Sequence, residues 1–159
     1  MGAMGSSKNA SAARAIVALG NPYRGDDGVG PAVLRALRES GIVEAELLES
    51  VHVGLPLAQA LVGYEKVLIV DGAPWLPAGR ISRLALREFR SRAGYLHGLG
   101  LQDAFAALSR IEEGVPEVEI LAIGIGGGQL GFREGLSPAV AAAMLRAKEE
   151  VMRWLQEGS

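Results

Sequence analysis

The chain has 159 residues, a formal net charge of −2 and no cysteine. This length fits one domain that can bury a full hydrophobic core. The nearly balanced charge gives no reason to expect nucleic acid or an anionic membrane as a partner. The lack of cysteine excludes disulfides, thiolate metal sites and a cysteine nucleophile, and it fits a reducing compartment. No apolar run is long enough to cross a bilayer, so we expect a cytoplasmic protein without membrane insertion.

Apolar runs and helical patterns alternate along the chain after residue 13. Residues 1–13 include Gly-Ala-Met-Gly-Ser, which is typical of an expression tag, and we expect them to be disordered; residues 14–157 form the single predicted domain. Strands alternating with helices predict an α/β sandwich, with a mostly parallel sheet and helices on both faces. The predicted strands cover residues 14–19, 45–49, 66–70, 79–86 and 118–123, and the predicted helices cover residues 29–39, 55–61, 101–110 and 138–155.

Two adjacent acids follow the first predicted strand, in the sequence Gly-Asn-Pro-Tyr-Arg-Gly-Asp-Asp-Gly-Val-Gly that begins at Gly20. The spacing of Gly20 and Gly25 is similar to that of a phosphate-binding loop, which continues with Lys and Ser or Thr. Asp26 and Asp27 stand there instead, and carboxylates repel phosphate and attract a cation or a proton. Acids near a helix start also serve as caps. We assign Asp26 to the structure of the loop and Asp27 to chemistry.

A third acid, Asp71, directly follows the apolar run at residues 67–70. A carboxylate in that position is costly to bury unless it is paired or bound to a ligand. The alternative is that Asp71 forms a turn with Gly72, because Asp-Gly favours turns. If the first and third strands are neighbours, Asp26, Asp27 and Asp71 share the carboxyl edge of the sheet, where ligands of such folds bind.

The chain has two histidines, His52 and His97. A metalloprotease helix with two histidines four residues apart is therefore excluded. One histidine with two carboxylates still suits a divalent metal with open coordination positions. His97 lies in a glycine-spaced segment, residues 91–100, that is predicted to be a loop, and His52 follows the second strand. The residues alone leave both open, each as a ligand or as a surface or packing residue.

The segment 124–135 is rich in glycine and contains one match to G-x-G-x-x-G, which begins at Gly126. A dinucleotide site needs a helix directly after this motif, and none is predicted, so we interpret the segment as a flexible loop over the site. Ser137 is predicted to cap the last helix, with Pro138 at its first position. No G-x-S-x-G is present, so a serine-hydrolase elbow has no support.

Together, these motifs resemble those of the hydrogenase maturation endopeptidase family, over nearly the whole chain after residue 14. The resemblance implies a five-stranded mixed sheet in which residues 79–86 form the antiparallel strand. It also implies a peptidase that removes a C-terminal extension from the large-subunit precursor of a nickel–iron hydrogenase. The shared features, in chain order, are Gly20-Asn21, Asp26-Asp27, the strand before Asp71, His97 with the Gly-Leu segment after it, and Gly135-Leu136-Ser137-Pro138.

The same resemblance implies one metal site formed by Asp27, Asp71 and His97, and it selects His97 over His52. These three residues are then both the metal ligands and the catalytic residues of an aspartyl-type peptidase. The expected metal is nickel, which the precursor supplies, so the resting protein can be free of metal. The expected partner is the large-subunit precursor, and we favour a monomer. The residues that bind the substrate are not identified.

Two mechanisms and two rival functions stay open. A metal can polarise a carbonyl or lower the pKa of bound water, or Asp27 or Asp71 can act as a general base while the metal only docks the substrate. The rivals are a non-catalytic chaperone that checks for the metal and a small-molecule hydrolase on the same scaffold, because a fold does not fix a function. Only the peptidase shortens a precursor protein.

Overall fold

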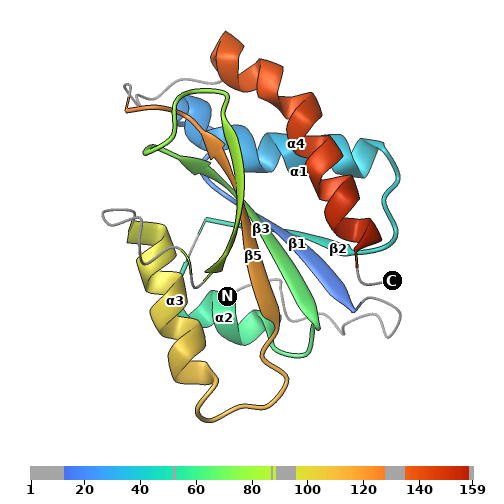
Figure 1. Ribbon diagram of the computed structural model, residues 1–159, viewed down its shortest axis with the longest axis vertical. Helices are drawn as coiled ribbons and strands as arrows, with labels where there is room; N and C mark the ends of the chain where they lie inside the picture. Colours follow the sequence, from blue (N-terminus) through green and yellow to red (C-terminus); the bar gives the residue numbers. More distant parts are fainter. Residues whose placement is uncertain (1–12, 52, 87, 89–95, 128–134, 158–159) are drawn as a thin grey trace.

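The computed structural model describes residues 13–51, 53–86, 88, 96–127 and 135–157, without the side chains of residues 96–99. Its elements follow one another in the order shown by the colours of Figure 1. They are β1 (Arg14–Leu19), the 3₁₀ helix η2 (Gly25–Gly28), α1 (Val29–Glu39), β2 (Glu46–Ser50), α2 (Leu55–Leu61), β3 (Lys66–Ala73), β4 (Ile81–Ala85), α3 (Leu96–Leu108), β5 (Glu117–Gly124) and α4 (Pro138–Gln156).

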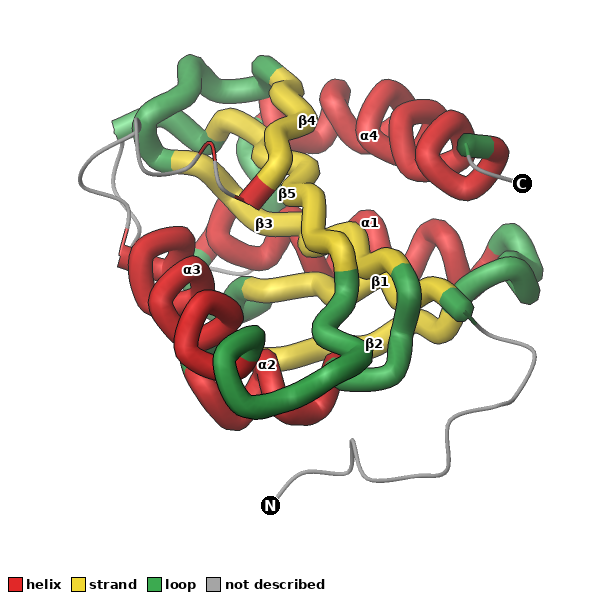
Figure 2. The backbone as a smooth tube through the Cα atoms, turned by 60° about the horizontal axis from the view of Figure 1, so that its bottom comes forward, coloured by secondary structure: helices red, strands yellow, loops and turns green. Residues whose placement is uncertain are grey.

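The strands form one five-stranded sheet in the order β2-β1-β3-β5-β4. The first four strands in this order are parallel, and β4 pairs antiparallel with β5, with Ile81 opposite Ile123. Figure 2 shows β2 and β4 at the two edges of the sheet. The predicted mixed, mostly parallel sheet is confirmed, and so are the neighbouring positions of the first and third strands.

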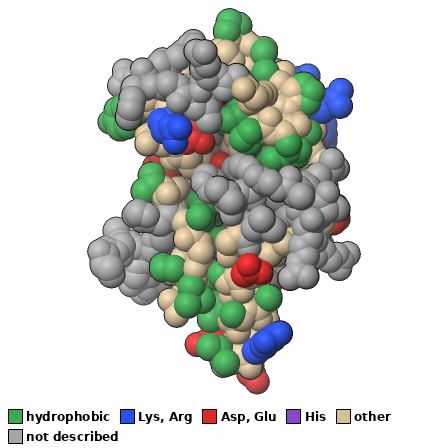
Figure 3. All heavy atoms as spheres, turned by 90° about the vertical axis from the view of Figure 1, so that its left-hand side faces the viewer, with side chains coloured by type: hydrophobic (Ala, Val, Ile, Leu, Met, Phe, Trp, Pro, Cys, Tyr) green, Lys and Arg blue, Asp and Glu red, His purple; other side chains and the backbone are tan. Residues whose placement is uncertain are grey.

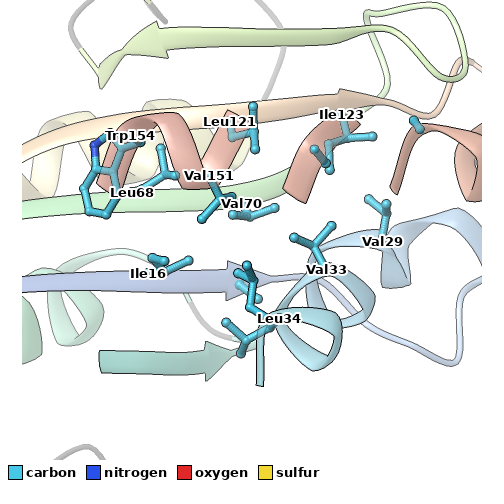
Figure 4. Packing of buried hydrophobic residues seen from close by; sticks show 14 of the residues in the cluster. Ile16, Val29, Val33, Leu34, Leu68, Val70, Leu121, Ile123, Val151 and Trp154 are labelled. Atoms are coloured by element: carbon cyan, nitrogen blue, oxygen red, sulfur yellow. The ribbon is translucent and has the colours of Figure 1, made fainter. Parts of the chain in front are cut away.

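Helices cover both faces of the sheet, which explains why the central strands are mostly apolar. Helices α1 and α4 pack on one face, and α2 and α3 on the other (Figures 1 and 2). Along β1, Ile16 and Ala18 join the core beneath α1 and α4, while Ala15, Val17 and Leu19 join the core beneath α2 and α3. Figure 4 shows the first core, where Trp154 and Val151 of α4 face Leu68 and Val70 of β3. Strands buried on both faces are expected to be continuously hydrophobic.

Helix α1 begins in direct contact with the ends of two strands. A Cβ atom added at Gly30 would lie 2.4 Å from the Leu19 carbonyl oxygen and 2.7 Å from that of Val70. Gly20, which follows β1, has φ +131°, and a Cβ there would lie 2.0 Å from the Asp27 carbonyl oxygen. Only glycine permits this backbone conformation and this close approach. The glycines of the first loop therefore hold η2 and α1 against the carboxyl ends of β1 and β3.

The structure corrects two predicted boundaries. Helix α3 begins at Leu96 and not at residue 101, so the backbone of His97 is helical and does not lie in a loop. Strand β3 continues to Ala73, because its ladder with β5 extends to the pair Ala73–Gly124. Asp71 therefore lies within the strand and does not follow it. The predicted loop at residues 91–95, most of the glycine-rich segment and His52 lie outside the described residues.

In the part of the chain that the structure describes, no helix is long and apolar enough to cross a membrane. Figure 3 shows one face, on which the coloured acidic and basic side chains form small groups and no continuous patch of one sign. The prediction made for residues 1–12 lies outside the described range.

A glycine-to-alanine pair tests the close approach of α1. Gly30→Ala should destabilise the protein, because overpacking against backbone costs roughly 1–3 kcal/mol or more, which exceeds the gain in helix propensity of about 1 kcal/mol. The melting temperature should fall by roughly 5 °C. Gly100→Ala is the matched control, since Gly100 lies in α3 and an added Cβ there meets no described atom within 4 Å outside the nearby backbone of its own helix. An unchanged melting temperature for Gly30→Ala in differential scanning calorimetry would contradict this account.

Candidate functional site

Asp71 is a carboxylate buried within the sheet. It is 2% exposed and lies in β3 opposite Ala122 of β5. Its Oδ1 accepts a hydrogen bond from the backbone N–H of Gly72 at 2.9 Å. Removing a carboxylate from water is unfavourable unless hydrogen bonds, a cation or a metal compensate. A buried acid among apolar strand residues is therefore a candidate for a functional role.

Strand alternation shows which face of the sheet carries Asp71. A Cβ atom at the next residue, Gly72, would lie 3.2 Å from Ile125 and 3.5 Å from Val29, so Gly72 faces the core beneath α1 and α4. Successive residues of a strand point to opposite faces, so Asp71 faces the layer of α2 and α3. Helix α3 begins in that layer, with His97 as its second residue. The side chain of His97 lies outside the described part of the chain.

Asp27 lies in η2, between the end of β1 and the start of α1. Its Oδ2 accepts a hydrogen bond from the backbone N–H of Asn21 at 2.9 Å. The Asn21 side chain in turn accepts one from the backbone N–H of Tyr23 at 2.9 Å. Within the described residues Oδ1 of Asp27 has no hydrogen-bond partner. One oxygen thus fixes the carboxylate to its own loop, and the other remains available to a ligand.

The fold brings the two acids to one edge of the sheet. Strands β1 and β3 are parallel neighbours, with Ala18 opposite Val70, so their carboxyl ends lie side by side. The 3₁₀ helix η2, which carries Asp27, contacts β3, which carries Asp71. The prediction that both acids lie at this edge is supported by the positions of their elements.

Asp26 has a different role from its neighbour. Its Oδ1 accepts a hydrogen bond from the backbone N–H of Ser137 at 2.6 Å, and its Oδ2 accepts one from the Ser137 hydroxyl at 2.8 Å. Neither Asp26 nor Asp27 caps α1, whose N-cap is Gly28 with no side-chain hydrogen bond. Ser137 is the N-cap residue of α4, as predicted, but its hydroxyl bonds to Asp26 and not to its own helix. The assignment of Asp26 to structure agrees with these contacts.

The bond between Asp26 and Ser137 is the feature of the site that sequence reasoning missed. The two residues are 111 positions apart, and a pairing over that distance leaves no local pattern in one sequence. The Ser-Pro step before the last helix predicts a cap, and only the packing of α4 beside η2 shows that the serine binds Asp26.

A complete metal site is not seen within the described residues, which hold no group of three His, Asp or Glu side chains close enough to share an ion. Asp27 and Asp71 supply two carboxylates at one edge, and oxygen donors of this kind suit a divalent cation when a nitrogen ligand joins them. The set of Asp27, Asp71 and His97 stays a prediction.

No family profile matches the chain, and no curated protein sequence matches it. Solved structures do. A NiFe hydrogenase maturation protease HybD from Thermococcus kodakarensis has 26% identity and a TM-score of 0.67, over 89% of this chain and 98% of the other. A hydrogenase 2 maturation peptidase from a Thaumarchaeota archaeon has 28% identity and a TM-score of 0.62, over 89% and 97%.

A third structure shares the fold. The hydrogenase maturating endopeptidase HybD from Escherichia coli has a TM-score of 0.75 at 24% identity, over 91% of this chain and 94% of the other. The matches cover almost all of both chains, so they concern the whole domain and not one shared motif. The chain thus has the fold of these structures over its whole length. From the names of the two that are 26% and 28% identical, we conclude that it is a peptidase that resembles the hydrogenase maturation endopeptidases.

Proposed function

We propose that this peptidase removes a C-terminal extension from the large-subunit precursor of a nickel–iron hydrogenase after nickel has been inserted. The observation that carries the proposal is the buried carboxylate of Asp71 in β3, a strand that contacts η2, the 3₁₀ helix that holds Asp27. The structures similar to this chain are named as hydrogenase maturation proteases, which supports the same substrate class.

Asp27, Asp71 and His97 would hold nickel that arrives with the precursor. Asp27 would offer its Oδ1, because Oδ2 is engaged by Asn21. Asp71 is fixed in the sheet and would add a second oxygen from a rigid position. An imidazole nitrogen with two carboxylates suits nickel and leaves positions for groups of the precursor. Bound nickel would supply Lewis acidity toward the peptide carbonyl or toward water.

The chain's own residues would make cleavage depend on finished nickel insertion. Three ligands of this kind bind a metal ion weakly until the substrate adds its own, so a stable complex would form only with the loaded precursor. Either carboxylate could also accept a proton from the attacking water. The proposed site thus joins recognition of the metal to hydrolysis of the bond.

The ligand set can be tested by conservative substitution. Asp27→Asn, Asp71→Asn and His97→Ala should each lower kcat/KM for a nickel-loaded precursor by at least about 100-fold. Asparagine keeps an oxygen acceptor for the backbone N–H of Asn21 or Gly72, so the melting temperature should change little. Cleavage is followed by the intact mass of the precursor.

His52→Ala and Asp103→Asn are the controls for a lost histidine and a lost carboxylate, and both should cleave normally. Wild-type rates for all three ligand variants would rule out the site.

The dependence on nickel can be tested on the precursor itself. Intact-mass spectrometry should show loss of a short C-terminal peptide from nickel-loaded precursor and none from the metal-free form. Reconstitution with nickel should restore cleavage, whereas magnesium should not, because magnesium prefers sites formed entirely by oxygen. Equal cleavage of the loaded and metal-free precursors would remove nickel from the proposal. Binding without loss of mass would favour the chaperone.

A further inference from the structure

A groove of about 390 Å³ lies beside the turn that carries Asp27. Its walls come from three segments far apart in sequence: the loop between β1 and α1, the exposed side of α1, and the residues just before α4. The lining residues are Pro22, Tyr23, Gly25 and Gly28 from the loop, Ala32 and Arg35 from α1, and Gly135 and Leu136 before α4. We refer to this cavity as the Tyr23–Arg35 groove.

The groove borders the η2 turn of the candidate site. Gly25 and Gly28 are the first and last residues of η2, and Asp26 and Asp27 lie between them. A peptide in the groove would therefore lie against the same short turn that presents the Asp27 carboxylate. A substrate that is cut at the site must continue away from it over the neighbouring surface, and this groove provides such a path.

Asp26 and Ser137 hold two walls of the groove together. The Asp26 carboxylate bonds to both the backbone N–H and the hydroxyl of Ser137, at 2.6 and 2.8 Å. Gly135 and Leu136, which line the groove, directly precede Ser137. Hydrogen bonds to a carboxylate are among the stronger ones in proteins. The groove is therefore formed before any ligand binds, which lowers the entropy lost on binding.

The described lining carries one cation. Among the lining residues that the structure describes, Arg35 is the sole charged side chain. No carboxylate of the described chain lies within salt-bridge distance of Arg35. Arg38, one turn later on α1, is paired with Glu49 at 3.2 Å. Tyr23 adds an aromatic ring that is 63% exposed. The described part of the groove thus offers an apolar surface and the positive charge of Arg35, which suits a peptide with an acidic side chain.

We propose that the Tyr23–Arg35 groove binds a segment of the precursor next to the cleaved bond, and that Arg35 pairs with an acidic side chain of that segment. This inference rests on the proposed function. Arg35 would act as a specificity residue and not as a catalytic one, because the hydrolysed bond lies at the acidic edge. Such a contact contributes to binding, and thus to KM, and leaves kcat nearly unchanged.

The test is a comparison of two charge reversals. Arg35→Glu should raise KM for the nickel-loaded precursor on the order of tenfold, with kcat within about twofold, because attraction is replaced by repulsion. Arg110→Glu is the matched control, because it makes the same change in net charge on an exposed residue that follows α3 and does not line the groove. KM of the control should equal that of the wild type. Arg35→Lys should recover most of the affinity.

Two further measurements distinguish a direct contact of Arg35 with the precursor from a loss of structure in the variant: the dependence of KM on ionic strength, and reversal of the charges on the precursor. The wild-type KM should rise with ionic strength, and Arg35→Glu should lose that rise, since screening weakens an attraction between exposed charges. Lysine in place of the acidic residues near the cleaved bond of the precursor should restore a low KM to Arg35→Glu. The groove proposal is wrong if the KM of Arg35→Glu matches that of the control, or if charge exchange restores nothing while the variant melts like the wild type.

Failure of the groove can be distinguished from failure of the proposed function. If the wild type cleaves and Arg35→Glu has an unchanged KM, the peptidase assignment stands and the groove is rejected. If the wild type does not cleave the loaded precursor, the proposed function is rejected, and fluorescence anisotropy of the labelled precursor then tests the groove alone. Weaker binding by Arg35→Glu than by Arg110→Glu would support the groove in that case, and equal binding would reject it.

Discussion

The contact between the first turn of α1 and the ends of β1 and β3 is the constraint on which the site depends. Gly30 lies so close to the carbonyl oxygens of Leu19 and Val70 that no side chain fits between them. This approach places η2, which directly precedes α1, over the carboxyl edge of the sheet and against β3. The glycine positions in the first loop thus decide where the acidic pair lies. Ligand sites of open α/β sheets occur at this same edge.

Two adjacent carboxylates in this loop are used in opposite ways. Asp26 accepts two hydrogen bonds from Ser137 and ties the loop to the start of α4. Asp27 accepts one bond from Asn21 and keeps its second oxygen without a partner among the described residues. A single 3₁₀ turn therefore contains one acid that maintains the structure and one that can bind a ligand. The first makes the position of the second reproducible, which a preorganised site requires.

Asp71 holds a carboxylate at a rigid and buried position of the sheet. A hydrophobic residue at this place in β3 would extend the apolar run and avoid the desolvation of a charge. The strand fixes Asp71, while Asp27 is held through a loop, so the two carboxylates differ in freedom to move.

The sequence by itself determined the sheet, its two helical layers and the edge where Asp27 and Asp71 lie. The family resemblance added which edge strand is antiparallel. Continuous apolar runs identify strands covered on both faces, and glycine turns mark the loops between them. The tertiary structure alone decided the start of α3 at Leu96, the extension of β3 to Ala73 and the partner of Ser137. Residues spaced by glycines carry a weak helix signal, which tertiary packing overrides. Strand β3 extends as far as its hydrogen-bonded neighbour β5 does. A hydrogen bond between residues 111 positions apart exists only once the chain has folded.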